Sequence, residues 1–266
     1  MSGFSIDWLS LREPFDHAAR STRLTDALAA ALPQRGGPLR LIDLGCGHGS
    51  NLRYLAPRLS RPQAWTLVDH DPVLLSHAVA QPVPDGVSVV AVQRDLSAGV
   101  GDLPLDADVV VTSALLDLVS RPWLESLAHR CAAERLPLLA ALTVDGRVSF
   151  SPADPRDADV MRWFRAHQRT DRGFGPSPGY LAADEAAGLL EAAGMIVETE
   201  QADWIIPASA AKMTAEMVRG IASASAACSP QPERVSGWLE ARLGQVGALS
   251  MVVGHVDLLA LTAGDV

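Results

Sequence analysis

Three glycines at alternate positions follow an apolar run in the segment LIDLGCGHGSN, residues 41–51. Gly45, Gly47 and Gly49 can adopt positive φ and let a ligand approach the main chain closely. Where such a turn joins a strand to a helix, backbone N–H groups and the helix N-terminus face the polar end of a bound ligand. The turn therefore predicts a small-molecule site at the carboxyl edge of a parallel sheet.

Two acidic residues stand at the ends of the next apolar runs. Asp69, in LVDHDP, lies about 20 residues after Gly49, where a carboxylate accepts both hydrogens of a ribose diol. Asp95, in VQRDL, can accept from an exocyclic adenine amine, while the Leu96 N–H is offered to a ring nitrogen. His70 can cover one face of the adenine. As alternatives, Asp69 caps the following helix and Asp95 is only a loop acid.

The glycine pattern is GxGxG, whereas the dinucleotide fingerprint is GxGxxG. Ser50 stands where the third glycine would fall, and Asp43 lies inside the preceding apolar run. The pattern fits an adenosyl ligand with a charged amino-acid tail better than a diphosphate. We expect Asp43 to organise the turn by accepting backbone N–H groups, and Cys46 to contribute its backbone rather than its thiol.

In this order and spacing, the three segments resemble motifs of the class I S-adenosylmethionine-dependent methyltransferases. The resemblance covers roughly residues 39–206 and the last strand. It implies an α/β, doubly wound Rossmann-like fold whose seven-stranded sheet is mostly parallel with a reversed last strand. It also implies S-adenosyl-L-methionine as cofactor, with Ser113 or its backbone near the methionine part. The residues expected to bind the cofactor are Arg20, Gly45, Cys46, Gly47, Asn51, Asp69, His70, Asp95, Leu96 and Ser113.

Sequence motifs that are absent narrow the acceptor. The chain has neither the NPPY tetrapeptide of amino-group methylases on bases and glutamine nor the proline–cysteine pair of cytosine-C5 enzymes. We expect a small-molecule acceptor methylated at O or N. Two alternatives remain open. One is an NAD(P)-dependent oxidoreductase, which the missing third glycine disfavours, and the other is a non-catalytic domain that binds S-adenosylmethionine.

His167 and Asp117 are the catalytic candidates. His167 lies in RWFRAHQRTDRGFGPSPGY, residues 162–180, surrounded by four arginines together with Trp163 and Phe174. An imidazole is suited to general-base work because its ordinary pKa lies near neutrality. The segment could hold an anionic or aromatic acceptor, or be the solvated face of an amphipathic helix. Asp117 follows the fourth predicted strand, where it faces the substrate or caps the next helix.

Strands that alternate with helices must position these residues, and continuous apolar runs such as Val109–Val111 indicate strands buried on both faces. Strands are expected at 39–45, 64–71, 87–95, from 107 into a loop ending at 119, 136–144, 195–206 and 248–262. Helices are expected at 13–32, 51–59, 72–80, 123–134, 157–168 and 181–194, with two more in 207–247. Pro14 suits a first helical turn, Asp145-Gly146 predicts a hairpin, and His255 and Asp257 are expected to form a buried hydrogen-bonded pair.

The length of 266 residues suits one domain. We expect a single methyltransferase domain over 1–266, divided into an N-terminal helical cover (1–36), a donor-binding half (37–150) and a substrate-side half (151–266) with a helical insertion (207–247). In the cover, Arg12 or Arg20 could pair with the ligand carboxylate. An Asp16–Arg20 pair one helical turn apart is the alternative for Arg20.

Composition sets the remaining expectations. The net charge of −9 disfavours nucleic acid as a partner. Three widely spaced cysteines, the lack of a signal-like segment and the lack of a long apolar run favour a cytoplasmic protein that does not enter a membrane. The histidines lack HxxxH or HxH spacing, and no metal is expected. Residues 207–247 are expected to pack on the sheet, with a lid or a homodimer surface as alternatives.

Overall fold

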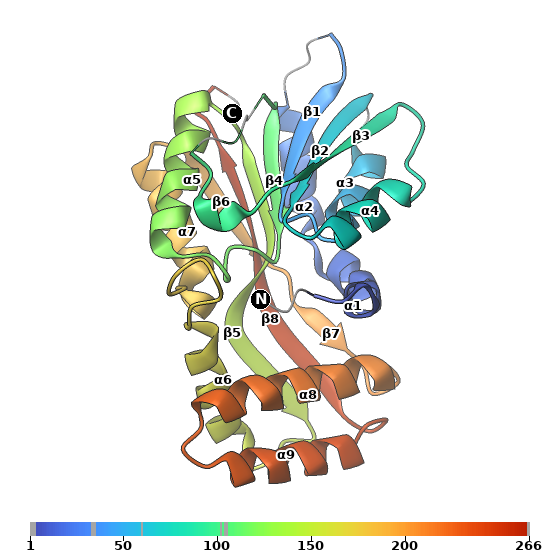
Figure 1. Cartoon of the computed structure of the whole chain (residues 1–266), viewed down its shortest axis with the longest axis vertical. Helices are drawn as coiled ribbons and strands as arrows, with labels where there is room; N and C mark the ends of the chain where they lie inside the picture. Colours follow the sequence, from blue (N-terminus) through green and yellow to red (C-terminus); the bar gives the residue numbers. More distant parts are fainter. Residues whose placement is uncertain (1–3, 33–35, 60, 102, 104–105, 265–266) are drawn as a thin grey trace.

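The computed structural model describes residues 4–32, 36–59, 61–101, 103 and 106–264. One sheet runs through the molecule (Figure 1). Its strands are β1 (Leu39–Leu44), β2 (Gln63–Asp69), β3 (Val87–Gln93), β4 (Val109–Ser113), β5 (Leu138–Ser151), β6 (Ile196–Gln201), β7 (Trp204–Ile206) and β8 (Ser250–Leu261). The helices are α1 (Ile6–Ala19), α2 (Thr22–Ala31), α3 (Ser50–Leu55), α4 (Pro72–Ala80), α5 (Arg121–Glu134), α6 (Asp157–Gln168), α7 (Ala182–Ala192), α8 (Ala211–Cys228) and α9 (Pro232–Gly244).

The strand order is β3-β2-β1-β4-β5-β8-β6, and β7 also pairs with β8. Strands β1 to β5 pair in parallel, whereas β8 runs antiparallel to both β5 and β6. The predicted α/β sheet with a reversed last strand is therefore confirmed. The predicted strand at 195–206 is interrupted, so that β6 and β7 lie one after the other along β8.

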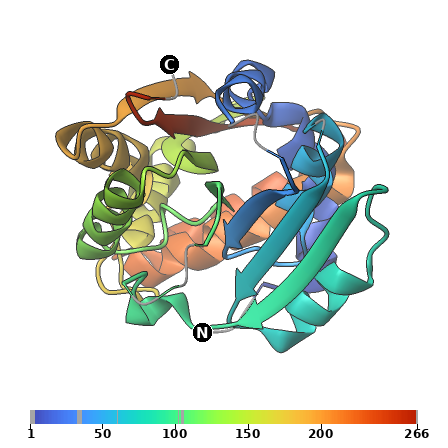
Figure 2. The ribbon, with the colours of Figure 1, turned by 90° about the horizontal axis from the view of Figure 1, so that it is seen from above.

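Helices cover both faces of the sheet, as Figures 1 and 2 show from two directions. Because successive residues of a strand point to opposite faces, Val110 packs with α5 and α7, while Val109 and Val111 pack with α2, α3 and α4. A third apolar cluster lies beyond this sandwich, where the long strands β5 and β8 continue toward α6, α8 and α9. The sheet is thus buried on both faces at the end of β1, where the glycine turn begins.

The predicted hairpin at Asp145-Gly146 is wrong, because residues 138–151 form one continuous strand, β5. The register against β8 shifts between Val144 and Val148, so this segment is a bulge. Asp145 and Arg147 fold over Gly254 of β8, where an added Cβ would lie 2.2 Å from Asp145 Oδ1. An Asp-Gly pair is common at hairpin turns. Here the same dipeptide bends a strand, and Gly146 has φ +78°.

The predicted helix at 13–32 is also wrong, because two helices occupy this region. α1 begins at Ile6 after the Ser5 cap, whose hydroxyl accepts from Trp8 N–H, so Pro14 lies inside the helix rather than in its first turn. The chain leaves helical geometry at Arg20, and the Ser21 hydroxyl caps α2 by accepting from Leu24 N–H. Two serine caps therefore define the boundaries.

His255 and Asp257 do not bond to each other as expected. The ring Nδ1 of His255 bonds to the Val253 carbonyl at 3.0 Å. The buried Asp257 carboxylate instead accepts from Leu142 N–H at 2.8 Å and from Ser21 N–H at 2.9 Å. Leu142 lies at a second register shift of β5 and has φ +54°, a strained conformation for a residue with a side chain. Asp257 thus fastens the α1–α2 junction to this bulge.

We expect Asp257→Ala to lower the free energy of unfolding by about 3–5 kcal/mol, because it leaves buried donors and the nearby Arg20 guanidinium without their partner. Denaturant unfolding followed by circular dichroism measures this change. Asp26→Ala, at an exposed position of α2, is the matched control and should cost less than about 0.5 kcal/mol. Equal stability of the two variants would remove Asp257 from the interactions that hold α1 in place.

Candidate active site

Two cavities, each of about 440 Å³, meet at the carboxyl ends of the parallel strands. We call the one that contains the glycine turn the donor cavity, and the one over the extension of β5 and β8 the acceptor cavity. Both volumes lie in the range of small-molecule sites. Residues that line both cavities are Phe4, Arg12, Ala114, Leu118, His167 and Arg172. The two spaces are therefore contiguous.

The glycine turn forms one wall of the donor cavity. Gly45, Gly47 and Gly49 have φ of +67°, +53° and +87°, which only glycine adopts without strain. Gly45 N–H and Cys46 N–H both donate to the Val68 carbonyl. Burial raises the pKa of the Cys46 thiol, so this side chain stays protonated near neutrality. Backbone in this conformation leaves room for a ligand against the main chain.

The acids predicted to hold a nucleoside lie in the same cavity. Asp69 pairs in register with Gln93, two residues before Asp95, and the residues Asp69, His70, Asp95 and Leu96 all line the cavity. Asp69 Oδ2 accepts from Gly47 N–H at 2.8 Å, and Oδ1 accepts from Asp71 N–H at 3.0 Å. Asp71, not Asp69, caps α4. Asp95 accepts from Ser97 N–H, which lowers the pKa of its carboxyl.

Asp43 does not organise the turn through backbone N–H groups as expected. Its Oδ1 accepts from the side-chain amide of Asn51 at 3.1 Å, and its Oδ2 has no hydrogen-bond partner in the described part of the chain. Burial raises the pKa of Asp43 to about 7. Asp43 and Asn51 both line the donor cavity, as does Ser113 at the end of β4. An unpaired buried carboxylate oxygen at this wall is suited to a ligand that brings a donor or a positive charge.

Arg20, predicted to contact the ligand, lines neither cavity. Its guanidinium is buried, donates to Asn51 Oδ1 at 2.9 Å and lies 3.4 Å from Asp257 Oδ2. The alternative, an Asp16–Arg20 side-chain pair, is not formed either, and Asp16 instead accepts a bifurcated hydrogen bond from Arg12 Nε. The chain turns away from α1 at Arg20, so this side chain lies outside the cavity. From there the guanidinium holds the Asn51 side chain, which does line the cavity.

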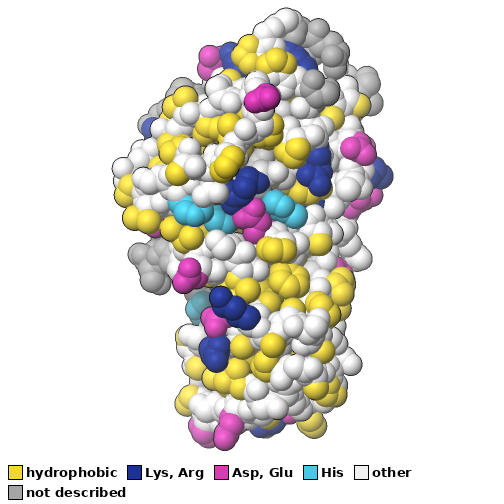
Figure 3. All heavy atoms as spheres, turned by 90° about the vertical axis from the view of Figure 1, so that its right-hand side faces the viewer, with side chains coloured by type: hydrophobic (Ala, Val, Ile, Leu, Met, Phe, Trp, Pro, Cys, Tyr) yellow, Lys and Arg dark blue, Asp and Glu magenta, His cyan; other side chains and the backbone are white. Residues whose placement is uncertain are grey.

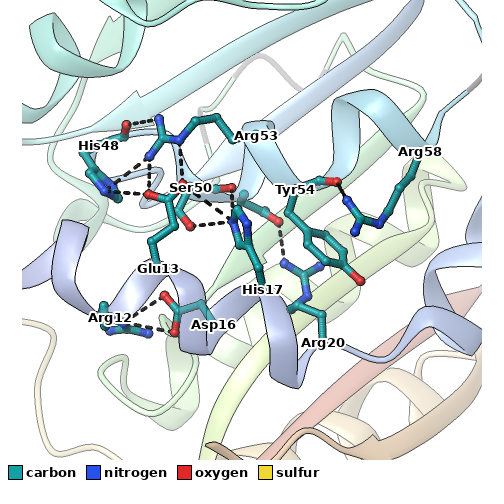
Figure 4. A network of polar contacts seen from close by, with 11 residues as sticks. Arg12, Glu13, Asp16, His17, Arg20, His48, Ser50, Arg53, Tyr54 and Arg58 are labelled. Carbon is teal, nitrogen blue, oxygen red and sulfur yellow. Dashed lines mark hydrogen bonds and ion pairs between the residues drawn. The ribbon is translucent and has the colours of Figure 1, made fainter. Parts of the chain in front are cut away.

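α1 contributes side chains to the walls of both cavities. Charged contacts fasten it to the glycine turn and to α3 (Figure 4). Glu13 accepts from Arg53 at 2.7 and 2.6 Å and lies 2.9 Å from His48 Nε2. Although burial opposes ionisation, the hydrogen bonds from Arg53 and His48 hold the pKa of Glu13 well below its usual range. The face that carries α1 shows a band of arginine, histidine and acidic side chains above a group of hydrophobic ones (Figure 3). The ionised Glu13 and its partner Arg53 therefore anchor α1 to α3.

The acceptor cavity is mostly apolar. Its floor is the extension of β5 and β8. One side is closed by α8, a helix of the 207–247 region. The apolar side chains in its wall are Phe4, Trp8, Ala114, Leu118, Leu142, Val144, Val148, Phe164, Trp204, Met217, Ile221, Ala224 and Val253. α8 also packs on α6 and on the third apolar cluster. A molecule in this cavity would be surrounded chiefly by hydrocarbon and aromatic rings.

The two catalytic candidates lie close to the junction of the cavities. His167 lines both cavities, and burial together with the nearby Arg172 lowers the pKa of its imidazole. Arg172 Nη2 lies 3.4 Å from His167 Nδ1. Asp117 lines the acceptor cavity, and burial raises the pKa of its carboxyl. Ser120, rather than Asp117, occupies the N-cap position of α5, so the capping interpretation of Asp117 is wrong.

The other arginines of the 162–180 segment do not join His167. Arg162 pairs with Asp159 at the surface, and Arg165 donates to the Gly146 carbonyl at 2.9 Å. Several polar residues of the acceptor-cavity wall did not stand out in the sequence as site residues. They include His255 on β8, Arg147 and Gln168, and Arg172 was not distinguished from its neighbours. The period-two pattern of β8 did indicate that His255 faces one side of the sheet, but not that a cavity lies there.

Within the described ranges, no group of three His, Cys, Asp or Glu side chains is arranged to hold a metal ion. None of the helices in these ranges combines the length and the apolar character that crossing a membrane requires.

Comparison with known proteins finds a methyltransferase-like segment and a shared fold. Residues 41–134 match the family model described as methyltransferase domain. The cyclopropane synthase MmaA2 from Mycobacterium tuberculosis superposes with a TM-score of 0.54 at 14% identity, covering 97% of this chain and 94% of that one. A cyclopropane-fatty-acyl-phospholipid synthase-like protein from Lactobacillus casei gives 0.55 at 17% identity, covering 97% and 95%. A search of curated protein sequences found no match.

The matched segment contains the glycine turn, Asp69 and Asp95. The fold of the two solved structures corresponds to that of this chain over nearly its whole length. Over residues 41–134 the chain is therefore similar to a methyltransferase domain, and its fold is shared with the two solved structures.

Proposed function

We propose that this enzyme transfers the methyl group to an oxygen or nitrogen of a small, largely apolar molecule bound in the acceptor cavity. The observation that supports this most directly is the contact between the two cavities, which share six lining residues. A donor in one cavity and an acceptor in the other can then react without either crossing solvent. Burying both reactants in one continuous space favours the near-attack geometry that displacement requires.

The donor roles follow from the walls of the donor cavity. Asp69 would bind the ribose diol, Asp95 and the Leu96 N–H would bind the adenine edge, and His70 would cover one adenine face. The backbone of Gly45, Cys46 and Gly47 would face the ribose and the amino-acid tail, together with Asn51 and Ser113. Since Arg20 lines neither cavity and Arg12 lines the donor cavity, Arg12 would take its place as the partner of the tail carboxylate.

His167 would act on the acceptor. S-adenosylmethionine supplies an electrophilic methyl group, whose bond to sulfur breaks as the acceptor nucleophile forms its own bond to carbon. The acceptor loses a proton in this exchange, and a neutral imidazole at the junction can take it. Asp117, buried nearby, would orient the acceptor. Since the Arg172 guanidinium disfavours a second positive charge, it keeps His167 in the neutral form that accepts a proton.

An acyl chain is the second candidate acceptor. The two solved structures with TM-scores above 0.5 are named a cyclopropane synthase and a cyclopropane-fatty-acyl-phospholipid synthase-like protein. The apolar wall of the acceptor cavity would suit a hydrocarbon chain as well as an aromatic ring. A homodimer, a cytoplasmic location and the absence of nucleic-acid partners remain predictions from the sequence.

Asp69→Ala should weaken the binding of S-adenosylhomocysteine by about 1–3 kcal/mol, because a buried hydroxyl pair loses its acceptor. Isothermal calorimetry measures the change, with Asp85→Ala at an exposed position as the control. NADH should show no binding to the unaltered protein. Unchanged affinity for S-adenosylhomocysteine would remove Asp69 from the ribose site, and tight binding of NADH would contradict the donor itself.

His167→Ala should lower kcat about 10²- to 10⁴-fold with little change in affinity for S-adenosylhomocysteine. A base works only when unprotonated, and the pKa of His167 is lowered from 6.5. The kcat of the unaltered enzyme should therefore stay high down to a pH below 6.5 and fall only at still lower pH. Release of S-adenosylhomocysteine with the best acceptor from a panel of hydroxylated and amino aromatic compounds provides the assay.

His129→Ala, at an exposed position of α5, is the control for this experiment. If His167→Ala kept both its turnover and the acidic limb of the pH profile, His167 would line the site without accepting a proton.

A further inference from the structure

We infer that His255 selects the acceptor, which must carry a hydroxyl or N–H group that donates a hydrogen bond to the His255 Nε2 atom. The inference rests on the proposed function, because it sets a requirement on the molecule that occupies the acceptor cavity. It names a chemical class, which is an apolar molecule with at least one hydrogen-bond donor. An acyl chain, whose hydrocarbon part has no donor, does not meet this requirement.

The main chain fixes the tautomer of His255. Its Nδ1 lies 3.0 Å from the carbonyl oxygen of Val253, two residues earlier in β8. A carbonyl oxygen only accepts, so Nδ1 carries the proton, and in a neutral ring Nε2 then has a free lone pair. No hydrogen bond to Nε2 is formed within the described residues. The ring therefore offers one acceptor and no further donor.

Packing fixes the orientation of the ring. His255 is 2% exposed and lines the floor of the acceptor cavity. Its ring centroid lies 4.7 Å from that of Trp204, and the guanidinium of Arg12 lies 5.0 Å from the centroid of the same indole. A ring wedged against an indole that is itself covered by α1 cannot turn out to solvent. The Nε2 atom of His255 therefore keeps its position when a molecule enters the acceptor cavity.

The ring also stays neutral. Burial, with Arg12 nearby, lowers the pKa of His255 to about 3. The other charged groups that face it are Arg147 on β5 and Asp203 before β7, and these two form an ion pair with each other. His255 is thus too weak a base to take the proton in catalysis. Its function is to accept a hydrogen bond.

A buried hydrogen-bond acceptor such as His255 Nε2, set in an apolar wall, discriminates strongly between molecules that have a hydrogen-bond donor and molecules that lack one. A molecule without a donor would cover Nε2 and leave it unpaired, which costs the full desolvation of that atom. Sites built to pair with a substrate O–H or N–H reject analogues that lack it far more strongly than apolar pockets reject a change of shape. His255 can therefore separate acceptors of the same size and shape.

Two probes of similar shape test this requirement, 2-naphthol and its methyl ether 2-methoxynaphthalene. Calorimetry is performed with the full-length protein saturated with S-adenosylhomocysteine. We expect the unaltered protein to bind 2-naphthol at least about tenfold more tightly than the ether. His255→Phe should bind the two probes equally, His255→Gln should keep part of the preference through its amide oxygen, and His129→Phe should behave as the unaltered protein.

Several outcomes would overturn the inference. Equal binding of the probes to the unaltered protein, failure of both to bind, or a preference that survives in His255→Phe would each do so. In all these cases S-adenosylhomocysteine still binds, so the failure is distinct from that of the donor assignment. If His255→Phe does not fold, ¹⁵N resonances of the unaltered protein decide. The Nε2 signal should be that of an unprotonated nitrogen and should shift when 2-naphthol is added, and a protonated Nε2 would contradict the inference.

Discussion

The buried carboxylate of Asp257 determines how the two halves of the site meet. It accepts from the main chain of β5 at Leu142 and from the main chain at the start of α2, beside the Arg20 guanidinium. Because these contacts hold α1 at one end and the contacts of Glu13 with Arg53 and His48 hold its middle, the helix lines both cavities. The strained Leu142 backbone is tolerated because its N–H finds this acceptor.

A chain of polar side chains continues from Asp257 to the glycine turn. Arg20 donates to Asn51, and Asn51 donates to Asp43, whose second oxygen lies unpaired at the donor cavity. Each member is buried, so each needs its neighbour to offset desolvation. The same residues that hold α1 therefore also orient the wall of the donor cavity. Arg20 therefore supports Asn51 in the donor-cavity wall although it lines neither cavity itself.

The sequence predicted the parts of the site that local chemistry encodes. Gly45 and Gly47, the strand-end Asp69 and the Asp95-Leu96 pair are recognisable from residue type and spacing, and all of them line one cavity. The predictions that failed depend on contacts between distant segments. A bulge replaces the hairpin because Gly254 lets Asp145 fold over β8, and α1 extends to Ile6 because Ser5 caps it. The acceptor cavity is lined by residues from seven segments that lie apart in the sequence, so no single pattern could predict its walls.

The two cavities constrain the chain in different ways, and only the acceptor cavity lies on the extension of β5 and β8. The donor cavity is built at the ends of β1 to β4, where positive-φ glycines and paired acids leave little freedom. The acceptor cavity is floored by the bulged extension, and most of its wall is apolar side chains whose exchange changes shape without unpairing a buried polar group. Under the proposed function, exchange of these apolar side chains would change the acceptor while the donor site is preserved, and polar groups in that wall such as His255 would discriminate between acceptors of similar shape.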